Sequence, residues 1–392
     1  MLEEELRIGL PIQGIIKYYI YSFLELLPSQ EVKINSYDDH VKISSYNLIK
    51  VYTNAFKRII DRIEKSKNIY KSLIPLSSND NKIIKKVGEE LGIAKADIYE
   101  MIQQYVKNLD NGKYSIVDLS NALYPFSIGT YSVPSVFNIE FYGFTRGAYF
   151  DGKYDFKYKL NLHTLMILIA GFINARCLRF RKKGESISVL IFPPSFNEVK
   201  DFVPKNKEEW ISIQYLIENE AQKQAITSIY PIEAFILWLL INLPEEVTST
   251  VNLYLVAISE PAGLNPASPM TDFFIPMRTL SLLMEDFLKG LKDREDYKEK
   301  LNKYLLKPAL RYGILKKEKE DQLYEEEAMR YVKLLFVASQ KNRLSERIEL
   351  LNLSSRKYLL LLKKSTIKES EEKLAKLHSM MSHIAGKLIK SY

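Results

Sequence analysis

Cations and aromatic rings are closely interleaved between Phe141 and Lys183, and these are the residue types that bind nucleic acid. Lysine and arginine side chains neutralise phosphates, whereas tyrosine and phenylalanine rings stack on unpaired bases. Only two carboxylates, Asp151 and Asp155, oppose the cations. The alternative is a β-core in which the rings face inward and the cations simply face water. We predict a nucleic-acid-binding surface formed by the cations of this segment, which are Arg146, Lys153, Lys157, Lys159, Arg176, Arg179, Arg181, Lys182 and Lys183.

The last of these cations lie in the stretch CLRFRKKGESISVLIFPP, which predicts a β-hairpin with its tip at Gly184. Leu178 and Phe180 alternate with Arg179 and Arg181, so we expect the apolar pair to face the core and the two arginines to point outward. Lys182 and Lys183 would then lie at the tip. Cations on a rigid hairpin can bind a phosphate at a fixed position without contacting the bases.

Residues that catalysis usually requires are scarce. The sequence has four histidines and a single cysteine, Cys177, and it has neither a phosphate-binding Gly-rich loop nor a G-x-S-x-G nucleophile motif. We expect His163 to be a hydrogen-bonded core residue rather than a metal ligand. Asp38 and Asp39 are expected to form a solvated turn rather than a nuclease metal site. The sequence therefore predicts a protein with no catalytic residues, no metal site and no cofactor.

Residues 81–106 have the outline of a helix-turn-helix, with the turn at Gly92. A DNA-binding regulator is therefore an alternative to be weighed. In that case the second helix would present Lys95, Asp97, Glu100, Gln103 and Gln104 to the groove. Two of these side chains are carboxylates, which phosphates repel, and only one is a cation. We therefore favour two packed helices without groove reading.

Helical and strand periodicities occur together in residues 1–276, which predicts an α+β fold: a mixed N-terminal body with β-hairpins and buried helices. Residues 277–392 are helix-forming almost throughout, and we predict a C-terminal bundle of about four or five helices there. The elements predicted in the body are helices at 11–27, 46–65, 161–176, 210–225 and 232–243, hairpins at 31–45 and 177–194, β-structure within 114–159, a strand at 251–260 and a long loop at 261–276.

The positive charge is concentrated near the C-terminus. Residues 291–392 hold 24 Lys+Arg and 15 Asp+Glu, a net charge of +9, whereas the whole chain has a net charge of +8. Such a balance indicates a polyanionic partner. The two most apolar runs, 165–173 and 235–243, are shorter than the about 20 residues of a membrane-spanning helix, so we expect no membrane partner. The lone cysteine favours a cytoplasmic location, and the abundance of Lys, Ile and Tyr favours a thermophilic archaeal source.

Three features together resemble the large subunit of archaeal type I-A CRISPR surveillance (Cascade) complexes. They are the opening helix LPIQGIIKYYIYSFLELLPSQEVKINS, the buried helix containing Ala170 and Gly171 that leads into R-x-R-x-x-G-x-x-x-x-V-x-x-x-P at 179–193, and the basic helical end. The resemblance implies a non-catalytic subunit that binds the 5′ handle of the guide RNA (crRNA) and the target DNA.

Motif (PAM) recognition, strand opening, contact with the other subunits and recruitment of a helicase-nuclease also follow from the resemblance. Within it, the loop GLNPASP at 263–269 is a candidate motif-sensing element. Its Asn265 and Ser268 could donate hydrogen bonds to base edges. The alternatives are a helix-turn-helix regulator and a metal-dependent nuclease.

Overall fold

In the part of the chain that the structure describes, helices combine with three small sheets in an α+β fold, so the predicted fold class is confirmed. The structure is a computed structural model that describes residues 3–11, 15–28, 30–65, 73–93, 97–126, 129–137, 159–182, 185–193, 213–224, 226–261, 263, 265–292, 295–312, 319–363 and 369–390. None of the described helices is both long enough and apolar enough to span a membrane.

The chain forms two compact units, and neither is a continuous stretch of sequence. Unit 1 comprises Met1–Arg181, Glu185–Tyr215 and Leu253–Phe274. Unit 2 comprises Lys182–Gly184, Leu216–Asn252 and Ile275–Tyr392. The C-terminal helical part expected from residue 277 onward thus shares its unit with an earlier segment.

Unit 1 begins with a three-stranded antiparallel sheet in the order β1-β3-β2, formed by β1 (Glu4–Gly9), β2 (Lys33–Ser36) and β3 (His40–Ser45). Leu6 lies opposite Ile43 and Ile8 lies opposite Val41, and all four side chains are buried. Strands β2 and β3 pair antiparallel, so the hairpin predicted at 31–45 is confirmed. Strand β1 was not predicted, because only two apolar residues of this short segment alternate and its partner strand lies far along the chain.

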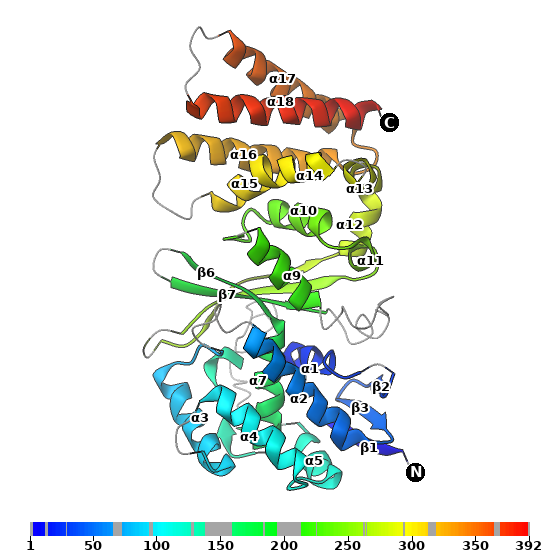
Figure 1. The fold of residues 1–392 in the computed structure, drawn as a ribbon, viewed down its shortest axis with the longest axis vertical. Coiled ribbons are helices and arrows are strands. Elements are labelled where there is room, and N and C mark those ends of the chain that lie inside the picture. Colours follow the sequence, from blue (N-terminus) through cyan, green and yellow to red (C-terminus); the bar gives the residue numbers. More distant parts are fainter. Residues whose placement is uncertain are drawn as a thin grey trace, which may run out of the picture. The chain divides into compact units, whose positions relative to one another are not determined.

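Two helices form the centre of this unit and lie side by side (Figure 1), namely α1 (Ile16–Leu24) and α7 (Leu162–Ala175). Every residue of α7 is buried, which explains its uniformly apolar sequence and confirms the predicted buried helix. Gly171 permits the close approach of the two helices. A Cβ atom at this position would lie 1.9 Å from the carbonyl oxygen of Tyr19.

The helix-turn-helix elements are present as α3 (Ser78–Leu91) and α4 (Ile98–Asp110). Gly92 ends α3 with a φ of +81°, a left-handed conformation that favours glycine. Asp97 caps the N-terminus of α4 by accepting hydrogen bonds from the backbone N–H groups of Tyr99 and Glu100. Helix α4 packs against α2 (Leu48–Lys65), which the sequence predicted.

The prediction of β-structure from residue 114 onward is wrong for its first part. Residues Ile116–Leu123 form helix α5, whose N-terminus is closed by a reciprocal capping box between Ser115 and Asp118. Short strands β4 (Tyr131–Ser132) and β5 (Lys159–Leu160) pair further on, and Ser135–Phe137 form the 3₁₀ helix η1. The predicted turn at Asp151 and Gly152 lies outside the described residues.

A four-stranded sheet completes unit 1, with β6 (Arg176–Lys182), β7 (Glu185–Phe192), β8 (Leu253–Ser259) and β9 (Ser268–Ile275) in sequential order. The predicted hairpin and the predicted strand at 251–260 are confirmed. The expected long loop at 261–276 is wrong in its second half, which forms β9. This strand lies at the edge of the sheet, where a missing backbone N–H at Pro269 is tolerated.

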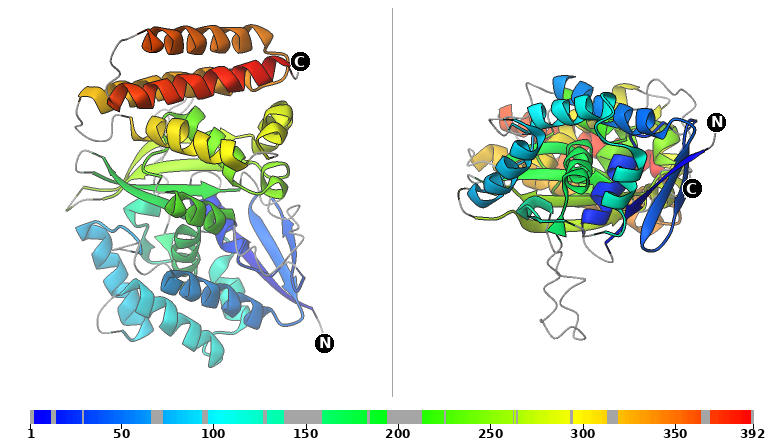
Figure 2. Two further views of the ribbon diagram at one scale, coloured as in Figure 1. Left: turned by 45° about the horizontal axis from the view of Figure 1, so that its top comes forward. Right: turned by 90° about the horizontal axis from the view of Figure 1, so that it is seen from below.

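Unit 2 is helical, as predicted. Its elements are α9 (Ile213–Lys223), α10 (Ile232–Asn242), α11 (Glu245–Thr248), α12 (Met277–Leu283), α13 (Glu285–Lys292), α14 (Glu295–Leu301), the π-helix η2 (Asn302–Leu306), α15 (Lys307–Arg311), α16 (Lys319–Ala338), α17 (Leu344–Leu362) and α18 (Glu369–Lys390). Helices α17 and α18 lie side by side (Figure 2). Within the described part of 277–392, several short helices precede the long helices α16, α17 and α18, so the region holds more helices than the four or five expected.

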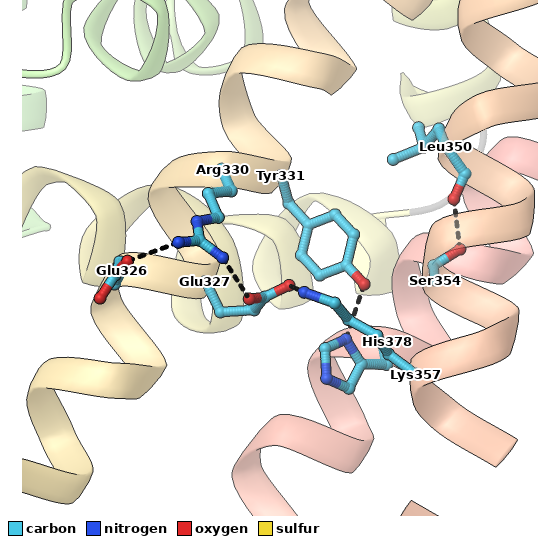
Figure 3. A network of polar contacts seen from close by, with 8 residues as sticks. All are labelled: Glu326, Glu327, Arg330, Tyr331, Leu350, Ser354, Lys357 and His378. Atoms are coloured by element: carbon cyan, nitrogen blue, oxygen red, sulfur yellow. Dashed lines mark hydrogen bonds and ion pairs between the residues drawn. The ribbon is translucent and has the colours of Figure 1, made fainter. Parts of the chain in front are cut away.

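The long helices are joined by buried and partly buried polar contacts (Figure 3). The hydroxyl of Tyr331 lies 2.7 Å from Nδ1 of the buried His378. Burial lowers the pKa of His378 to about 4, so its imidazole is neutral near pH 7. Lys357 on α17 pairs with Glu327 on α16. The guanidinium of Arg347 donates hydrogen bonds to three carbonyl oxygens near helix ends, those of Ala338, Gln340 and Leu388, at 3.0, 3.0 and 2.7 Å.

Candidate nucleic-acid interface

Arg176, the first residue of β6, lies in the core and not on the predicted binding surface. Its side chain is 1% exposed, and its guanidinium carbon lies 5.6 Å from the centre of the Phe172 ring. Its backbone carbonyl accepts a hydrogen bond of 3.3 Å from another buried arginine, Arg62. Arg176 therefore belongs to the packing between α7 and the sheet.

The expectation that Arg179 points freely outward is wrong. Its guanidinium donates three hydrogen bonds to the carboxylate of Glu260, two from Nε at 2.8 and 3.0 Å and one from Nη2 at 2.7 Å. Ser188 donates a further hydrogen bond of 2.6 Å to the same carboxylate. The side chain of Glu260 is 4% exposed, so this charge needs Arg179 as its partner. The alternation of apolar and basic residues along β6 could not predict this ion pair, because Glu260 lies far along the chain, directly after β8.

The other predicted cations are described to different extents. Arg181 and Lys182 end β6, and only their backbone is described, so the direction of their side chains stays a prediction. Lys159 is exposed and its Nζ lies 3.4 Å from the hydroxyl of Ser132. The remaining cations, Arg146, Lys153, Lys157 and Lys183, lie outside the described residues.

Asn265 and Ser268, the predicted motif-sensing residues, are both exposed. Asn265 lies in the β8–β9 loop, which we define as the residues between Ser259 and Ser268. Ser268 is the first residue of β9. The loop is tied to the N-terminus of α3, because the backbone N–H and the hydroxyl of Ser78 donate to the carbonyl of Gly263 at 2.9 and 3.1 Å. A second tie runs from the N–H of Ala267 to the hydroxyl of Ser135, at 3.3 Å.

Asp80 is the buried centre of these ties, and its role was missed in the sequence. Its side chain accepts hydrogen bonds from the backbone N–H and the hydroxyl of Ser77, at 2.9 and 2.7 Å. It also accepts from the N–H and the hydroxyl of Ser135, at 2.8 and 2.6 Å. A single carboxylate thus fixes the start of α3, the segment at Ser135 and, through Ser135, the β8–β9 loop. The signal in the sequence was the capping pattern S-x-x-D at 77–80.

Helix α3 carries three exposed lysines, Lys82, Lys85 and Lys86, which we call the α3 lysine row. Their spacing of three and four residues places them on one side of the helix, away from the buried Ile84 and Val87. Lys82 lies one turn beyond Ser78, which holds the β8–β9 loop. Among the residues that the structure describes, none of the three lysines forms an ion pair. Sequence reasoning considered only the second helix and overlooked this row.

The second helix of the helix-turn-helix outline is less suited to a phosphate-lined groove. Asp97 is the N-cap of α4, and Glu100 and Gln103 are exposed. Gln104 is half-buried and donates a hydrogen bond of 3.1 Å to Asn108. Lys95 lies outside the described residues. The first turn of α4 therefore contains the carboxylate of Glu100 and no cation. The amide of Gln103 follows in the next turn.

The histidine of α7 is a core residue, as expected. The hydroxyl of Tyr105 lies 2.8 Å from Nδ1 of His163, and burial lowers the pKa of His163 to about 4. Asp39 lies in an exposed turn, where hydrogen bonds from His40 and Tyr124 lower the pKa of its carboxyl. Within the described part of the chain, no three or more His, Cys, Asp or Glu side chains are grouped so that they could hold a metal ion.

A family model described as CRISPR-associated protein, CsaX, matches residues 41–303, which include the α3 lysine row, the β8–β9 loop and the four-stranded sheet. The comparisons with curated proteins and with solved structures gave no match.

Proposed function

The chain belongs to the CRISPR-associated CsaX family, and from this premise we propose that it is a non-enzymatic, nucleic-acid-binding large subunit of a guide-RNA-directed antiviral complex. In this proposal it binds the 5′ handle of the crRNA and the target DNA, recognises the motif beside the target, and helps to open the strands. It contacts the other subunits of a type I-A Cascade complex and recruits a helicase-nuclease. Its place would be the cytoplasm of a thermophilic archaeon.

The observation that carries the proposal is the α3 lysine row beside the anchored β8–β9 loop. Lysines spaced along one helix face contact successive phosphates and supply affinity without sequence information. Asn265 and Ser268 add side chains that can hydrogen-bond to base edges. Because Ser78 and Asp80 hold the loop against the same helix, a phosphate contact and a base contact would keep a fixed spacing.

The test is a binding measurement on the full chain, by fluorescence anisotropy with labelled single-stranded RNA, single-stranded DNA and duplex DNA across a salt series. Changing Lys82, Lys85 and Lys86 together to Ala should weaken binding at least tenfold. The slope of log affinity against log salt concentration should fall by about 2 to 3, since each phosphate contact contributes about 0.7 to 0.9. The matched control changes three other exposed lysines of unit 1, Lys50, Lys107 and Lys113, to Ala. Equal loss in the control, or no loss in either variant, overturns the proposed interface.

A second variant tests the hairpin. Arg181, Lys182 and Lys183 are changed together to Ala, while Arg179 is kept because Glu260 requires it. Weaker binding with an unchanged melting temperature would support the predicted role of the hairpin tip. Unchanged binding would remove the tip from the interface.

Two further results would support the alternative functions. Cleavage of labelled DNA in the presence of Mg²⁺ or Mn²⁺, abolished by one Asp or Glu substitution, would show a nuclease and overturn the non-enzymatic assignment. Tight binding to a single duplex sequence, with no preference for guide RNA, would show a regulator instead.

A further inference from the structure

Unit 2 contains a hollow of about 550 Å³ that is lined by aromatic rings and cations. Its walls come from α14, η2, α17 and α18, and they include Tyr297, Tyr304, Tyr358, His383, Lys300 and Lys376. A volume of this size lies within the range of about 300 to 1,000 Å³ that is typical of sites for small organic molecules. None of these residues belongs to the interface proposed above.

The rings are arranged as a stacking platform. Tyr297 and His383 have ring centres 5.3 Å apart and planes inclined by 24°, which is a stacked arrangement. Nζ of Lys387 lies 4.4 Å from the centre of the Tyr297 ring, and Nζ of Lys300 lies 5.4 Å from it. His383 is exposed. A flat aromatic ligand could therefore extend the stack from the imidazole.

A local irregularity of the helix places Tyr304 in the wall of the hollow. Residues Asn302–Leu306 form a π-turn just before Pro308, which has no backbone N–H to donate to the carbonyl of Tyr304. The hydroxyl of Tyr324 donates to this carbonyl instead, at 2.7 Å. The backbone that carries Tyr304 is thus fixed by a tertiary hydrogen bond. Nζ of Lys303 lies 5.4 Å from the centre of the Tyr304 ring.

The charges around the hollow favour an anionic ligand. Lys300 and Lys376 line it, and Lys303 and Lys387 contact its rings. Among the described residues, Glu372 in the lining and Asp296, which pairs with Lys300 at 3.2 Å, are carboxylates that oppose these cations. Lys300 and Asp296 are 53% and 59% exposed, so their ion pair is weak and a phosphate can displace the carboxylate.

Rings that stack and ammonium groups that neutralise phosphate are the two components of a site for one nucleotide. We propose that this hollow receives a single unpaired base of a single-stranded nucleic acid, with the adjoining phosphate on Lys300 and Lys376. The inference rests on the proposed function, because a strand held by the protein supplies the base. The same chemistry would fit a free mononucleotide, and the experiment separates these two sources.

The experiment has two arms on the full chain. In the first, a short oligouridine carrying one 5-iodouridine is photo-crosslinked and the attached residues are identified by mass spectrometry, with crosslinks expected at Tyr297, Tyr304 or His383. In the second, the affinity for labelled oligouridine and for a duplex is measured after Tyr304→Leu with His383→Leu. Loss of stacking should weaken single-strand binding about five- to 100-fold and leave duplex binding unchanged.

Controls distinguish loss of stacking from loss of structure. Tyr304→Phe with His383→Phe keeps both rings and should retain single-strand binding. Lys376→Glu changes an exposed residue of α18 and should weaken single-strand binding while the circular dichroism spectrum stays unchanged. If the Leu double variant and Lys376→Glu bind single strands as the wild type does, and the crosslinks lie elsewhere, the proposed base site is wrong. The proposed function would still stand in that case. Binding of uridine monophosphate without binding of any strand overturns both proposals.

Discussion

Arg179 on β6 and Glu260, the residue that directly follows β8, form a partly buried ion pair with three hydrogen bonds although they lie far apart in the sequence. The hydrogen bonds to Glu260 raise the pKa of Arg179 above its usual value. A cation that the sequence assigned to ligand binding is thus engaged within the protein.

We expect Arg179→Ala to destabilise the fold by about 1–3 kcal/mol, because it leaves the buried carboxylate of Glu260 without its cation. Thermal or urea unfolding measures the loss. The double change Arg179→Met with Glu260→Gln should recover much of the stability, and Arg356→Ala, at an exposed position, should cost little. If Arg179→Ala lowers nucleic-acid affinity at unchanged stability, the ion pair is not the role of this side chain.

Asp80→Ala should loosen the β8–β9 loop as well as the start of α3. It removes the acceptor of four hydrogen bonds, two from Ser77 and two from Ser135, and we expect a loss of about 1–3 kcal/mol. Hydrogen exchange at Ala267 and Ser135 should become faster. The matched control is Asp118→Ala, which removes an equivalent but exposed capping box from α5. Equal effects of the two changes on exchange in the loop would refute the anchoring role of Asp80.

Stability should fall as the pH drops from about 6.5 to about 4. Burial lowers the pKa of His163 and of His378 to about 4, whereas an unfolded histidine titrates near 6.5. The unfolded state therefore binds protons in this window that the folded state does not, and acid favours unfolding. Melting temperatures across this range should decline less steeply after His163→Gln or His378→Gln. Parallel curves for the wild type and both variants would show that these histidines do not set the acid sensitivity.

Gly171→Ala should disrupt the contact between α1 and α7, since the added Cβ would lie 1.9 Å from a backbone oxygen that cannot move independently of α1. We expect a loss of at least about 1–3 kcal/mol, as for other overpacked cores. Gly386→Ala is the natural control, because a Cβ there meets no atom within 4 Å and the residue lies within α18. That change should stabilise the protein by about 0.5–1 kcal/mol. Chemical denaturation should show a lower free energy of unfolding for Gly171→Ala and a higher one for Gly386→Ala.

The sequence predicted those elements whose pattern is complete within a single segment. Helix α7 is apolar on all sides because it is buried on all sides, and the β6–β7 hairpin was indicated by the apolar and basic alternation of CLRFRK followed by a β-branched run. His163 was placed correctly for the same reason, since its apolar neighbours already indicate a core position. Helix α5 was missed because the tyrosines and serines around it suggested strands, although S-x-x-D at 115–118 marked its start.

The candidate site was less predictable, because long-range partners decide it. Alternation along β6 assigns side chains to two faces of a sheet but does not reveal that Glu260 lies within reach of Arg179. Similarly, nothing local connects Ser135 with Asp80, or Tyr297 with His383. The α3 lysine row, by contrast, is a local pattern that the sequence alone displays as three cations at helical spacing.

The interrupted order of the two units has a consequence for synthesis of the protein. The four-stranded sheet of unit 1 gains β8 and β9 only when residues up to Ile275 have left the ribosome. By then Phe235 and Trp238 of α10 have already emerged, and both are fully buried in the finished protein, where α10 packs against α16. The nascent chain therefore carries two unfinished cores at the same time, and a chaperone that acts during translation would find its apolar target in α10.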